Sequence, residues 1–188
     1  MESNDPGSDL RKALGTWKAI GASNSVLSWI GYGFEFRFIH PPKRFLFANS
    51  PTCASSPGAV AFVDKEIATH VADGIFSETT KANVHVCNPI QVEPKGVGEF
   101  CNCHNMKYPN GFAASPSFAM DSLQKDVPLL VEPGDILFTE DLAKVYYKVP
   151  FAKESRKFQC FFLERKILRG CGPSLWLLSG TVCFYKTV

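Results

Sequence analysis

Asp141 is the first acid whose setting suggests chemistry. It ends a stretch that begins with apolar residues at Ile136, and two tyrosines, Tyr146 and Tyr147, follow after a gap of four residues. A carboxylate at the end of a buried strand costs free energy unless it meets water, hydrogen bonds or a cation. From this stretch alone, Asp141 is either a turn residue or a metal ligand.

A second group of candidate ligands combines thiols with an imidazole. Cys101, Cys103 and His104 lie close together, Cys87 lies upstream, and the four could supply a zinc site. The C-x-C-H spacing lacks the two-residue gap of a zinc knuckle. On a strand, Cys101 and Cys103 share one face and His104 points to the other. Buried thiols in a sheet are the favoured interpretation, and zinc stays as the alternative.

Basic residues supply the third group. Lys95 lies in a predicted hairpin turn, where an ammonium on a flexible stem can reach a phosphate. The other candidates are Lys107, Lys144, Lys148, Lys153, Arg156 and Lys157. By themselves they also fit an ordinary solvated face. None of the four histidines lies near a serine or cysteine in a nucleophile motif, so a hydrolase is unsupported.

The elements that must position these residues include three predicted helices. The first begins at Ser8, the second spans residues 26–34, and the third spans residues 59–73. The third is the clearest, with Gly74 as its C-terminal cap. Its apolar residues recur at helical spacing and are Val60, Val63, Ile67 and Val71.

Strands are predicted mainly in the second half of the chain. Residues 84–92 and 97–105 flank a hairpin turn, EPKGVG, and further strands are predicted at 136–138 and 157–163. YPNGF and VEPGD read as turns, and residues 40–57 as an irregular Pro-rich stretch. Helices and strands interleave without a regular repeat, which favours an α+β fold.

Composition sets the broad class. The 188 residues suffice for one sizeable domain, and a net charge of +2 is too mild to predict nucleic-acid binding. Seven cysteines, an odd number, indicate reduced thiols in a cytoplasmic or nuclear protein. No apolar stretch is long enough to span a membrane, so no membrane partner is expected. Oligomeric state is left open.

Two segments, in order, resemble the fingers and early palm of a reverse transcriptase. They are NPIQVEPKGVGEFCNCHNMKYPN and ILFTEDLAKVYYKVPFAKESRKFQCFF. The family's first fingers strand is matched by Asn88, Pro89, Val92, Pro94 and Lys95. Its second strand is matched by Phe100, Asn105, Lys107 and Asn110. Its metal-binding palm strand is matched by Phe138, Asp141, Leu142, Tyr146, Val149 and Pro150.

The resemblance implies the chemistry of an RNA-directed DNA polymerase, with an RNA or DNA template-primer and a dNTP as partners. Two Mg²⁺ ions would activate the primer hydroxyl and stabilise the leaving pyrophosphate. Asp141 would bridge them, and the backbone carbonyl of Leu142 would add a ligand. Tyr146 would lie under the incoming sugar and leave no room for a 2′-OH. Lys95 would hold the triphosphate, with Lys107 as a further nucleotide-binding residue.

The upstream region resembles a narrower class of retrotransposon. Trp17, the stretch VLSWIGYGF, Asn49 and the 59–73 helix look like the region before the polymerase in elements of the DIRS, tyrosine-recombinase type. Residues 1–7 are predicted to be a disordered N-terminus, and the resemblances imply that residues 8–163 form the fingers and early palm.

Two departures put catalysis in doubt. The family's triphosphate-binding arginine should follow Phe100, where this chain has Cys101, and a thiol does not replace a bidentate guanidinium. Residues 164–188 lack the family's loop, helix and second acid motif. Read one base later with permitted codons, Lys166 to Cys183 becomes KFYEAVALPFGFSLAPFV, which resembles that loop and helix. The tail is therefore predicted to be a frameshifted, degenerate copy.

The sequence thus predicts the fragment of a retroelement reverse transcriptase, with fingers and the first palm strand, inactive alone because Asp141 is its only candidate catalytic acid. Any Mg²⁺ would bind weakly. Two alternatives remain: a small nucleic-acid-binding module using the basic fingers face, and a zinc-binding domain built on Cys87, Cys101, Cys103 and His104.

Overall fold

Helices and strands alternate irregularly, which confirms the α+β class. The computed structural model describes residues 8–96, 98–114, 131–132, 134–136 and 149–171. The helices are α1 (Ser8–Lys12), α2 (Leu14–Ala19), α3 (Asn24–Tyr32), α4 (Pro57–Ala72) and α5 (Lys107–Asn110). The strands are β1 (Phe45–Leu46), β2 (Phe76–Thr79), β3 (Val86–Cys87), β4 (Ile90–Gly96), β5 (Glu99–His104), β6 (Cys160–Leu163) and β7 (Lys166–Gly170).

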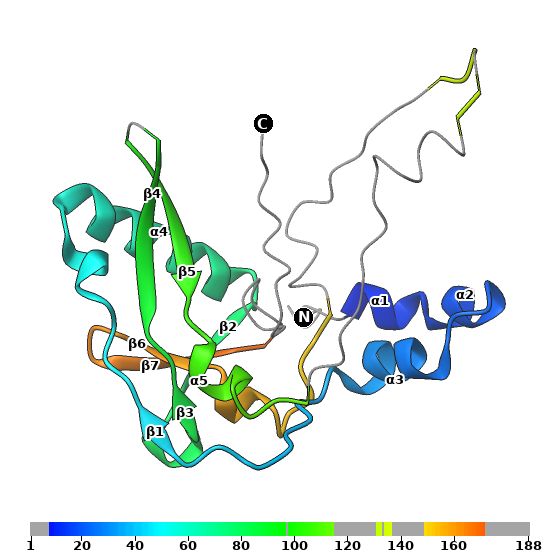
Figure 1. Cartoon of the computed structure of the whole chain (residues 1–188), viewed down its shortest axis with the longest axis horizontal. Coiled ribbons are helices and arrows are strands. Elements are labelled where there is room, and N and C mark those ends of the chain that lie inside the picture. Colours follow the sequence, from blue (N-terminus) through cyan, green and yellow to red (C-terminus); the bar gives the residue numbers. More distant parts are fainter. Residues whose placement is uncertain (1–7, 97, 115–130, 133, 137–148, 172–188) are drawn as a thin grey trace.

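A five-stranded sheet is the centre of the fold (Figure 1). Its strand order is β1-β3-β6-β7-β2, with β3 parallel to β1 and to β6, and β7 antiparallel to β6 and to β2. The central strand, β6, carries Phe161, which is buried among the side chains of the main hydrophobic core. Pairing of β3 with β6 joins segments that lie more than seventy residues apart.

The chain leaves this sheet at Asn88 and Pro89 and enters a separate two-stranded sheet, β4–β5. The prediction of one strand over residues 84–92 was therefore wrong, although the hairpin itself is confirmed. Asn88 accounts for the break: it is fully buried, its backbone N–H donates to the Cys160 carbonyl at 2.6 Å, and its Nδ2 donates to the Phe158 carbonyl at 2.8 Å. These bonds hold the chain where the two sheets divide.

Helix α4 covers one face of the hairpin and reaches β2. The Ser56 Oγ accepts a hydrogen bond from the Ala59 N–H at 3.1 Å, and Pro57 begins the helix. Gly74 follows in a left-handed conformation, as predicted. The predicted apolar face was half right, since Val60 and Val71 are 42% and 40% exposed. The buried residues are Ala59, Val63, Ile67 and His70.

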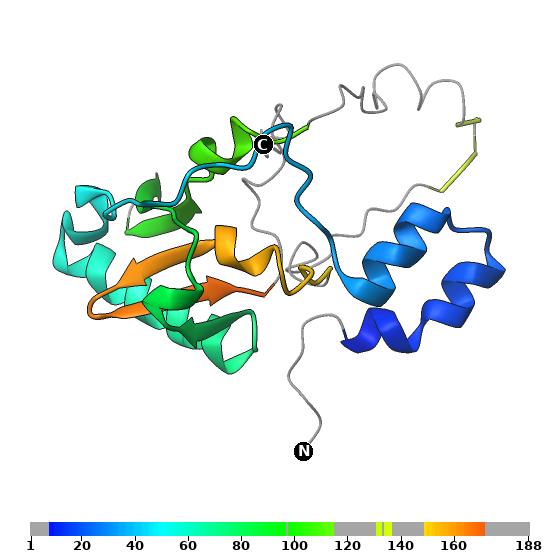
Figure 2. The same ribbon diagram turned by 90° about the horizontal axis from the view of Figure 1, so that it is seen from below.

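Helices α1, α2 and α3 form a lobe that stands apart from α4 and the sheets in both views (Figures 1 and 2). The predicted α3 is confirmed, and it ends at Gly33, whose φ is +94°. A Cβ at Gly33 would lie 2.6 Å from the Phe151 carbonyl carbon, so only glycine permits this approach. Phe34 then donates its N–H to the Pro150 carbonyl at 2.7 Å, which ties the lobe to the chain after the predicted palm strand.

Three further segments differ from or extend the sequence expectations. The Pro-rich stretch 40–57 contains β1, and YPNGF begins within the short helix α5. VEPGD turns as expected, with the Asp135 Oδ2 accepting from the Glu132 N–H at 2.8 Å. Strand β7 lies inside the predicted degenerate tail, pairs with β6 and β2, and contributes the buried Leu168 to the main hydrophobic core. Within the described ranges, no helix is both long and apolar enough to cross a membrane.

Candidate functional site

The β4–β5 hairpin has two chemically different faces. Ile90 and Val92 lie opposite His104 and Asn102, and this face belongs to the core beneath α4, where Phe100 meets Phe62 at 5.8 Å. Side chains alternate along a strand, so the other face carries the remaining residues. They are Gln91, Glu93, Cys101 and Cys103. The predicted sharing of one face by the two cysteines fits this register.

Lys95 lies near the tip of the hairpin. The pairing register shifts between Pro94 and Gly96, which leaves Lys95 without a partner residue on β5. A bulge of this kind redirects a side chain. The Lys95 side chain is exposed, and its ammonium is near enough to Cys101 to help lower the pKa of that thiol. The structure therefore places Lys95, which is predicted to bind the triphosphate, beside Cys101, the residue that departs from the family pattern.

Cys101 differs from the buried thiol that the sequence favoured. Its side chain is exposed, and its pKa is lowered to about 6, first by a hydrogen bond from Cys103 and then by the charge of Lys95. Partial burial and the charge of Glu93 act in the opposite direction. The lowered pKa favours the negatively charged form of Cys101, and a negative charge opposes rather than replaces the phosphate-binding arginine of the family.

Lys107 lies at the other end of the hairpin, as the first residue of α5. Asn105 prepares this position, since its Oδ1 accepts a hydrogen bond from the Lys107 N–H at 3.1 Å and its own N–H donates to the Pro89 carbonyl at 2.9 Å. The Lys107 side chain is exposed. The six residues of β5, at about 3.4 Å each, separate Lys95 from Lys107 by roughly 20 Å. The predicted nucleotide-binding roles of the two lysines stay predictions.

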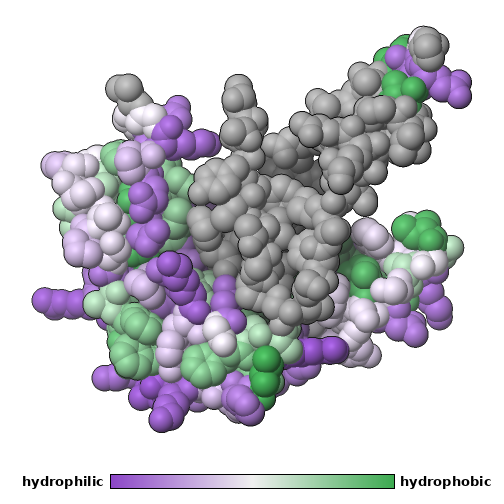
Figure 3. Space-filling view, in the orientation of Figure 1, coloured by the Kyte–Doolittle hydropathy of each residue, from purple (hydrophilic) through white to green (hydrophobic). Residues whose placement is uncertain are grey.

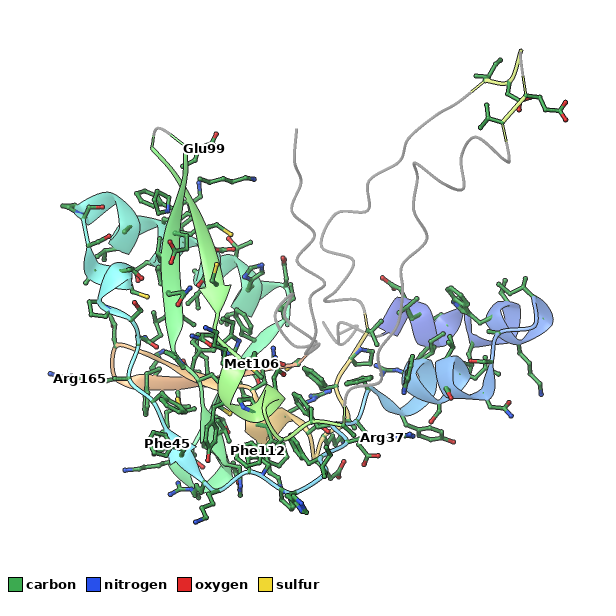
Figure 4. The ribbon with its side chains drawn as sticks, in the orientation of Figure 1. Arg37, Phe45, Glu99, Met106, Phe112 and Arg165 are labelled. Carbon is green, nitrogen blue, oxygen red and sulfur yellow. The ribbon has the colours of Figure 1, made fainter. Side chains whose placement is uncertain are left out.

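Around Lys107 the structure gathers an aromatic surface, here called the aromatic ledge and made of Phe45, Phe47, Tyr108 and Phe112. Neighbouring ring centroids lie 4.3–5.7 Å apart. Tyr108 donates its hydroxyl to the Lys43 carbonyl at 3.1 Å, and Phe45 is 48% exposed. Figure 4 shows Phe45 and Phe112 at the end of the molecule opposite Glu99 at the hairpin tip.

Four exposed cations border the aromatic ledge: Lys43, Arg44, Lys81 and Lys107. Arg44 is fixed by its Nε and Nη2, which donate to the Val84 and Lys81 carbonyls at 3.0 and 2.9 Å. In the part of the chain that the structure describes, none of the four is paired with a carboxylate. Hydrophobic and hydrophilic surfaces meet at this end of the molecule (Figure 3).

Sequence reasoning missed this surface, apart from Lys107. Its aromatic residues come from two segments more than sixty residues apart, and no periodicity links them. The local signal was the abundance of phenylalanine, with sixteen in the chain, and the basic-aromatic run KRFLF at residues 43–47.

Asp141, Leu142 and Tyr146 lie outside the described residues, so their catalytic, metal-binding and sugar-gate roles stay predictions. The chain that follows them is anchored on two sides. Phe151 donates its N–H to the Cys171 carbonyl at 2.8 Å, and Ala152 donates to the Phe34 carbonyl at 3.0 Å.

The four predicted zinc ligands do not come together. Cys87 lies in the five-stranded sheet, where it pairs with Cys160, whereas Cys101 and Cys103 lie on the hairpin. His104 is on the opposite face from the thiols, 5.1 Å from the Phe161 ring, and burial lowers its pKa to about 4. Among the described residues, no group of three or more His, Cys, Asp or Glu side chains is placed to hold a metal ion. The zinc alternative is therefore wrong for this set, because strand alternation and the division into two sheets separate its members.

Comparison with known proteins finds no matching protein-family profile and no matching curated sequence. Solved structures do match. The prototype foamy virus protease-reverse transcriptase (CSH mutant) has a TM-score of 0.55 at 14% identity, over 77% of this chain and 19% of that one. The foamy viral enzyme in complex with double-stranded DNA gives 0.52 at 12%, over 95% and 33%. Its complex with an RNA/DNA hybrid gives 0.51 at 13%, over 95% and 25%.

These identities establish the fold and not the activity. The chain spans a fifth to a third of the length of these three proteins. The chain therefore has a reverse-transcriptase-like fold.

Proposed function

We propose that this chain is a fragment of a retroelement reverse transcriptase that retains a nucleic-acid-binding surface and does not polymerise DNA by itself. One observation carries the binding proposal. The aromatic ledge lies at the base of a hairpin in a reverse-transcriptase-like fold, beside four cations that form no ion pair with a carboxylate among the described residues.

This combination suits a polynucleotide better than a small anion. Exposed aromatic rings stack on bases of any sequence, and lysines spread around them meet successive phosphates. Lys107 and Lys43 flank Tyr108, through chain adjacency and through the Tyr108 hydrogen bond. The solved reverse transcriptases of similar fold hold double-stranded DNA and an RNA/DNA hybrid, which supports a template or template-primer as the partner.

Lys95 contacts a different phosphate group from the polynucleotide phosphates near Lys107. It lies roughly 20 Å from Lys107 along the hairpin, so the tip would contact a dNTP while the base contacts the polynucleotide. The thiolate at Cys101 weakens the dNTP site, because it places a negative charge next to the Lys95 ammonium.

Fluorescence anisotropy with a labelled single strand and a labelled template-primer duplex tests the binding surface. Phe45→Ala is expected to cost about 1–3 kcal/mol of binding to the single strand and less to the duplex, because it removes one stacking ring. Lys107→Ala is expected to weaken both and to reduce the slope of log affinity against log salt by about one.

Lys18→Ala is the matched control, since it removes the same charge from the exposed surface of α2, in the other lobe. Equal losses of affinity in Lys18→Ala and Lys107→Ala would show that the effect depends on net charge and not on the position of the lysine. An unchanged Phe45→Ala affinity would remove the aromatic ledge from the interface.

The absence of polymerase activity from these 188 residues follows from two positions. Cys101 stands where the family has its triphosphate-binding arginine, and Asp141 is the one match to the catalytic acids. A lone carboxylate does not fix two Mg²⁺ ions, so Mg²⁺ binding at Asp141 is weak. A primer-extension assay with Mg²⁺ or Mn²⁺ should show no dNTP incorporation. Templated synthesis that disappears in Asp141→Asn would refute this proposal.

The retroelement class is proposed to be the DIRS, tyrosine-recombinase type, on the resemblance of the region from Trp17 to the 59–73 helix. The coding DNA tests both this and the proposed frameshift. A shifted frame that reads L-P-F-G near residue 175 supports the proposal that the rest of the palm is encoded in that frame. Any other reading there refutes the proposed frameshift.

A further inference from the structure

Arg169 lies in the middle of the face of the five-stranded sheet that points away from α4. Its neighbour Leu168 points into the main core, where it packs with Phe161 and α4, so Arg169 points to the other side of β7. Directly paired residues share a face, which places the Arg169 side chain between Cys160 of β6 and Ser77 of β2. Arg169 is partly buried, and its Nε is shielded from water. A cationic side chain therefore lies within a sheet face.

The Arg169 guanidinium has no anionic partner in the part of the chain that the structure describes. Its Nε makes no hydrogen bond, and no ion pair joins it to a carboxylate. Glu78 on the adjoining strand β2 pairs with Leu168, lies on the opposite face and is bound to Lys166. Burial raises the pKa of Cys160 to about 12, so this neighbouring thiol is neutral. A shielded positive charge costs free energy unless an anion accompanies it.

A second arginine, Arg156, comes from the turn that covers this face. The Arg156 carbonyl oxygen lies 3.6 Å from the Sγ of Cys160, the residue paired with Arg169. The Arg156 Nε donates to the Phe151 carbonyl at 3.1 Å, and Phe151 donates its N–H to the Cys171 carbonyl at 2.8 Å. Cys171 follows Arg169 by two residues, on the same side of the chain. These contacts bring the two guanidiniums to the same end of the sheet face.

Ser77 adds a hydroxyl to the two guanidiniums. Its Oγ lies 3.6 Å from the Cys171 Sγ, which confirms that Cys171 shares the face of Ser77 and Arg169. A serine hydroxyl rotates to donate a hydrogen bond wherever an acceptor lies. The charged side chains of this end of the face, Arg156 and Arg169, are both cations, and neither is paired with a carboxylate among the described residues.

We propose that Arg156 and Arg169, together with the Ser77 hydroxyl, bind a phosphate group, as free phosphate or as a terminal phosphate monoester. Each guanidinium can donate two parallel hydrogen bonds to a pair of oxygens. Donors from two strands and a turn approach from several directions, which suits a tetrahedral anion better than a planar carboxylate. A monoester offers three free oxygens and a phosphodiester offers two, so the backbone of a polynucleotide fits less well.

The phosphate site is separate from the aromatic ledge. Strand β7, which carries Arg169, is three strand positions away from β1, which carries Phe45, and this spacing corresponds to roughly 14 Å. The phosphate site is therefore independent of the proposed nucleic-acid interface, and an experiment can exclude either one without the other.

Isothermal titration calorimetry of the full chain with inorganic phosphate tests the site, with sodium chloride holding the ionic strength constant. The wild type should bind one phosphate. Arg156→Met and Arg169→Met should each weaken binding about tenfold or more, because each removes charge-assisted hydrogen bonds and keeps an unbranched side chain. Thymidine 5′-monophosphate is the second ligand. Tighter binding than that of phosphate identifies a terminal phosphate group as the ligand, and equal or weaker binding identifies the free anion.

Urea denaturation gives an independent measurement of the same site. Phosphate should raise the urea midpoint of the wild type, because a ligand that binds only the folded chain stabilises it. Without phosphate, Arg169→Met should be at least as stable as the wild type, since an apolar chain replaces an unpaired, shielded charge. Its midpoint should not respond to phosphate. Arg169→Lys keeps the charge but loses the planar fork, so its response should be smaller than that of the wild type.

Arg165→Met is the matched control, because Arg165 is exposed in the turn between β6 and β7 and the variant loses the same charge (Figure 4). It should keep the phosphate affinity of the wild type. The proposal is overturned if the wild type binds no phosphate, if Arg165→Met loses as much affinity as the other two methionine variants, or if those two bind like the wild type. Lower stability of Arg169→Met without phosphate, with an unchanged response to phosphate, would give Arg169 a purely structural role.

Discussion

Cys160 and Cys101 have the same side chain on two adjoining sheets, and their surroundings give them opposite properties. Cys160 is fully buried on the central strand of the five-stranded sheet, and its pKa is raised to about 12 by burial. Cys101 is exposed on the two-stranded hairpin, with a pKa lowered to about 6. The five-stranded sheet shields Cys160 from water, whereas the hairpin leaves Cys101 exposed to solvent.

Deletion of a ring should show the largest difference between the two sheets. Phe161→Ala empties the space between β6 and the Phe76 ring, 4.9 Å away, and should lower the free energy of unfolding by about 3–5 kcal/mol. Phe100→Ala, on the hairpin, removes a ring that is only partly buried and should cost roughly half as much or less. Urea denaturation of both variants measures the difference. Equal losses would mean that the hairpin is as much a part of the core as β6.

Exchange of sulfur for oxygen compares the two cysteines with the same chemical change. Cys160→Ser puts a hydroxyl where the carbonyls of Arg156 and Lys157 lie 3.6 and 3.8 Å from the present sulfur, too far for good hydrogen bonds. The expected cost is about 1–3 kcal/mol. Cys101→Ser should stay within about 0.5 kcal/mol of the wild type, because the site is exposed. Thermal unfolding under reducing conditions tests the pair, and a larger loss for Cys101→Ser would reverse the comparison.

The pH dependence of stability should have one sign for Cys101 and the opposite sign for the buried Cys87 and Cys160. Between about pH 6 and 9 the unfolded chain holds the Cys101 proton that the folded chain has released, so this residue makes stability rise with pH. Above about pH 9 the unfolded chain loses protons that folded Cys87 and Cys160 retain, so these residues make it fall. The urea midpoint should change less with pH than in the wild type, below pH 9 for Cys101→Ser and above pH 9 for Cys87→Ala. A Cys101→Ser profile that follows the wild type would show that Cys101 is not a thiolate.

Local pattern was sufficient for several elements. The helix from residue 57 to 72 carries its own start and stop signals, a serine cap, a proline and Gly74, and its position was predicted within two residues. The hairpin was predicted from two strand-like runs around EPKGVG. Lys95 and Lys107 lie at the tip and base of this hairpin, and their binding roles stay predictions.

Other features depend on partners distant in the sequence. The break at Asn88 is set by carbonyls of Phe158 and Cys160, and β1 is a strand because Phe45 and Leu46 pair with β3. The aromatic ledge depends on the meeting of Tyr108 with the Lys43 carbonyl. No window of the sequence contains both members of any of these pairs.

The sequence by itself determined the alternation of Cys101 and Cys103, because a side chain's face on a strand follows from the backbone period alone. It also determined the helix and hairpin signals, which act over a few residues. Only the tertiary structure decided that Cys101 is an exposed thiolate beside Lys95 and that Cys87 lies in another sheet. Burial and electrostatic environment are set by what packs against a residue, and those neighbours come from elsewhere in the chain.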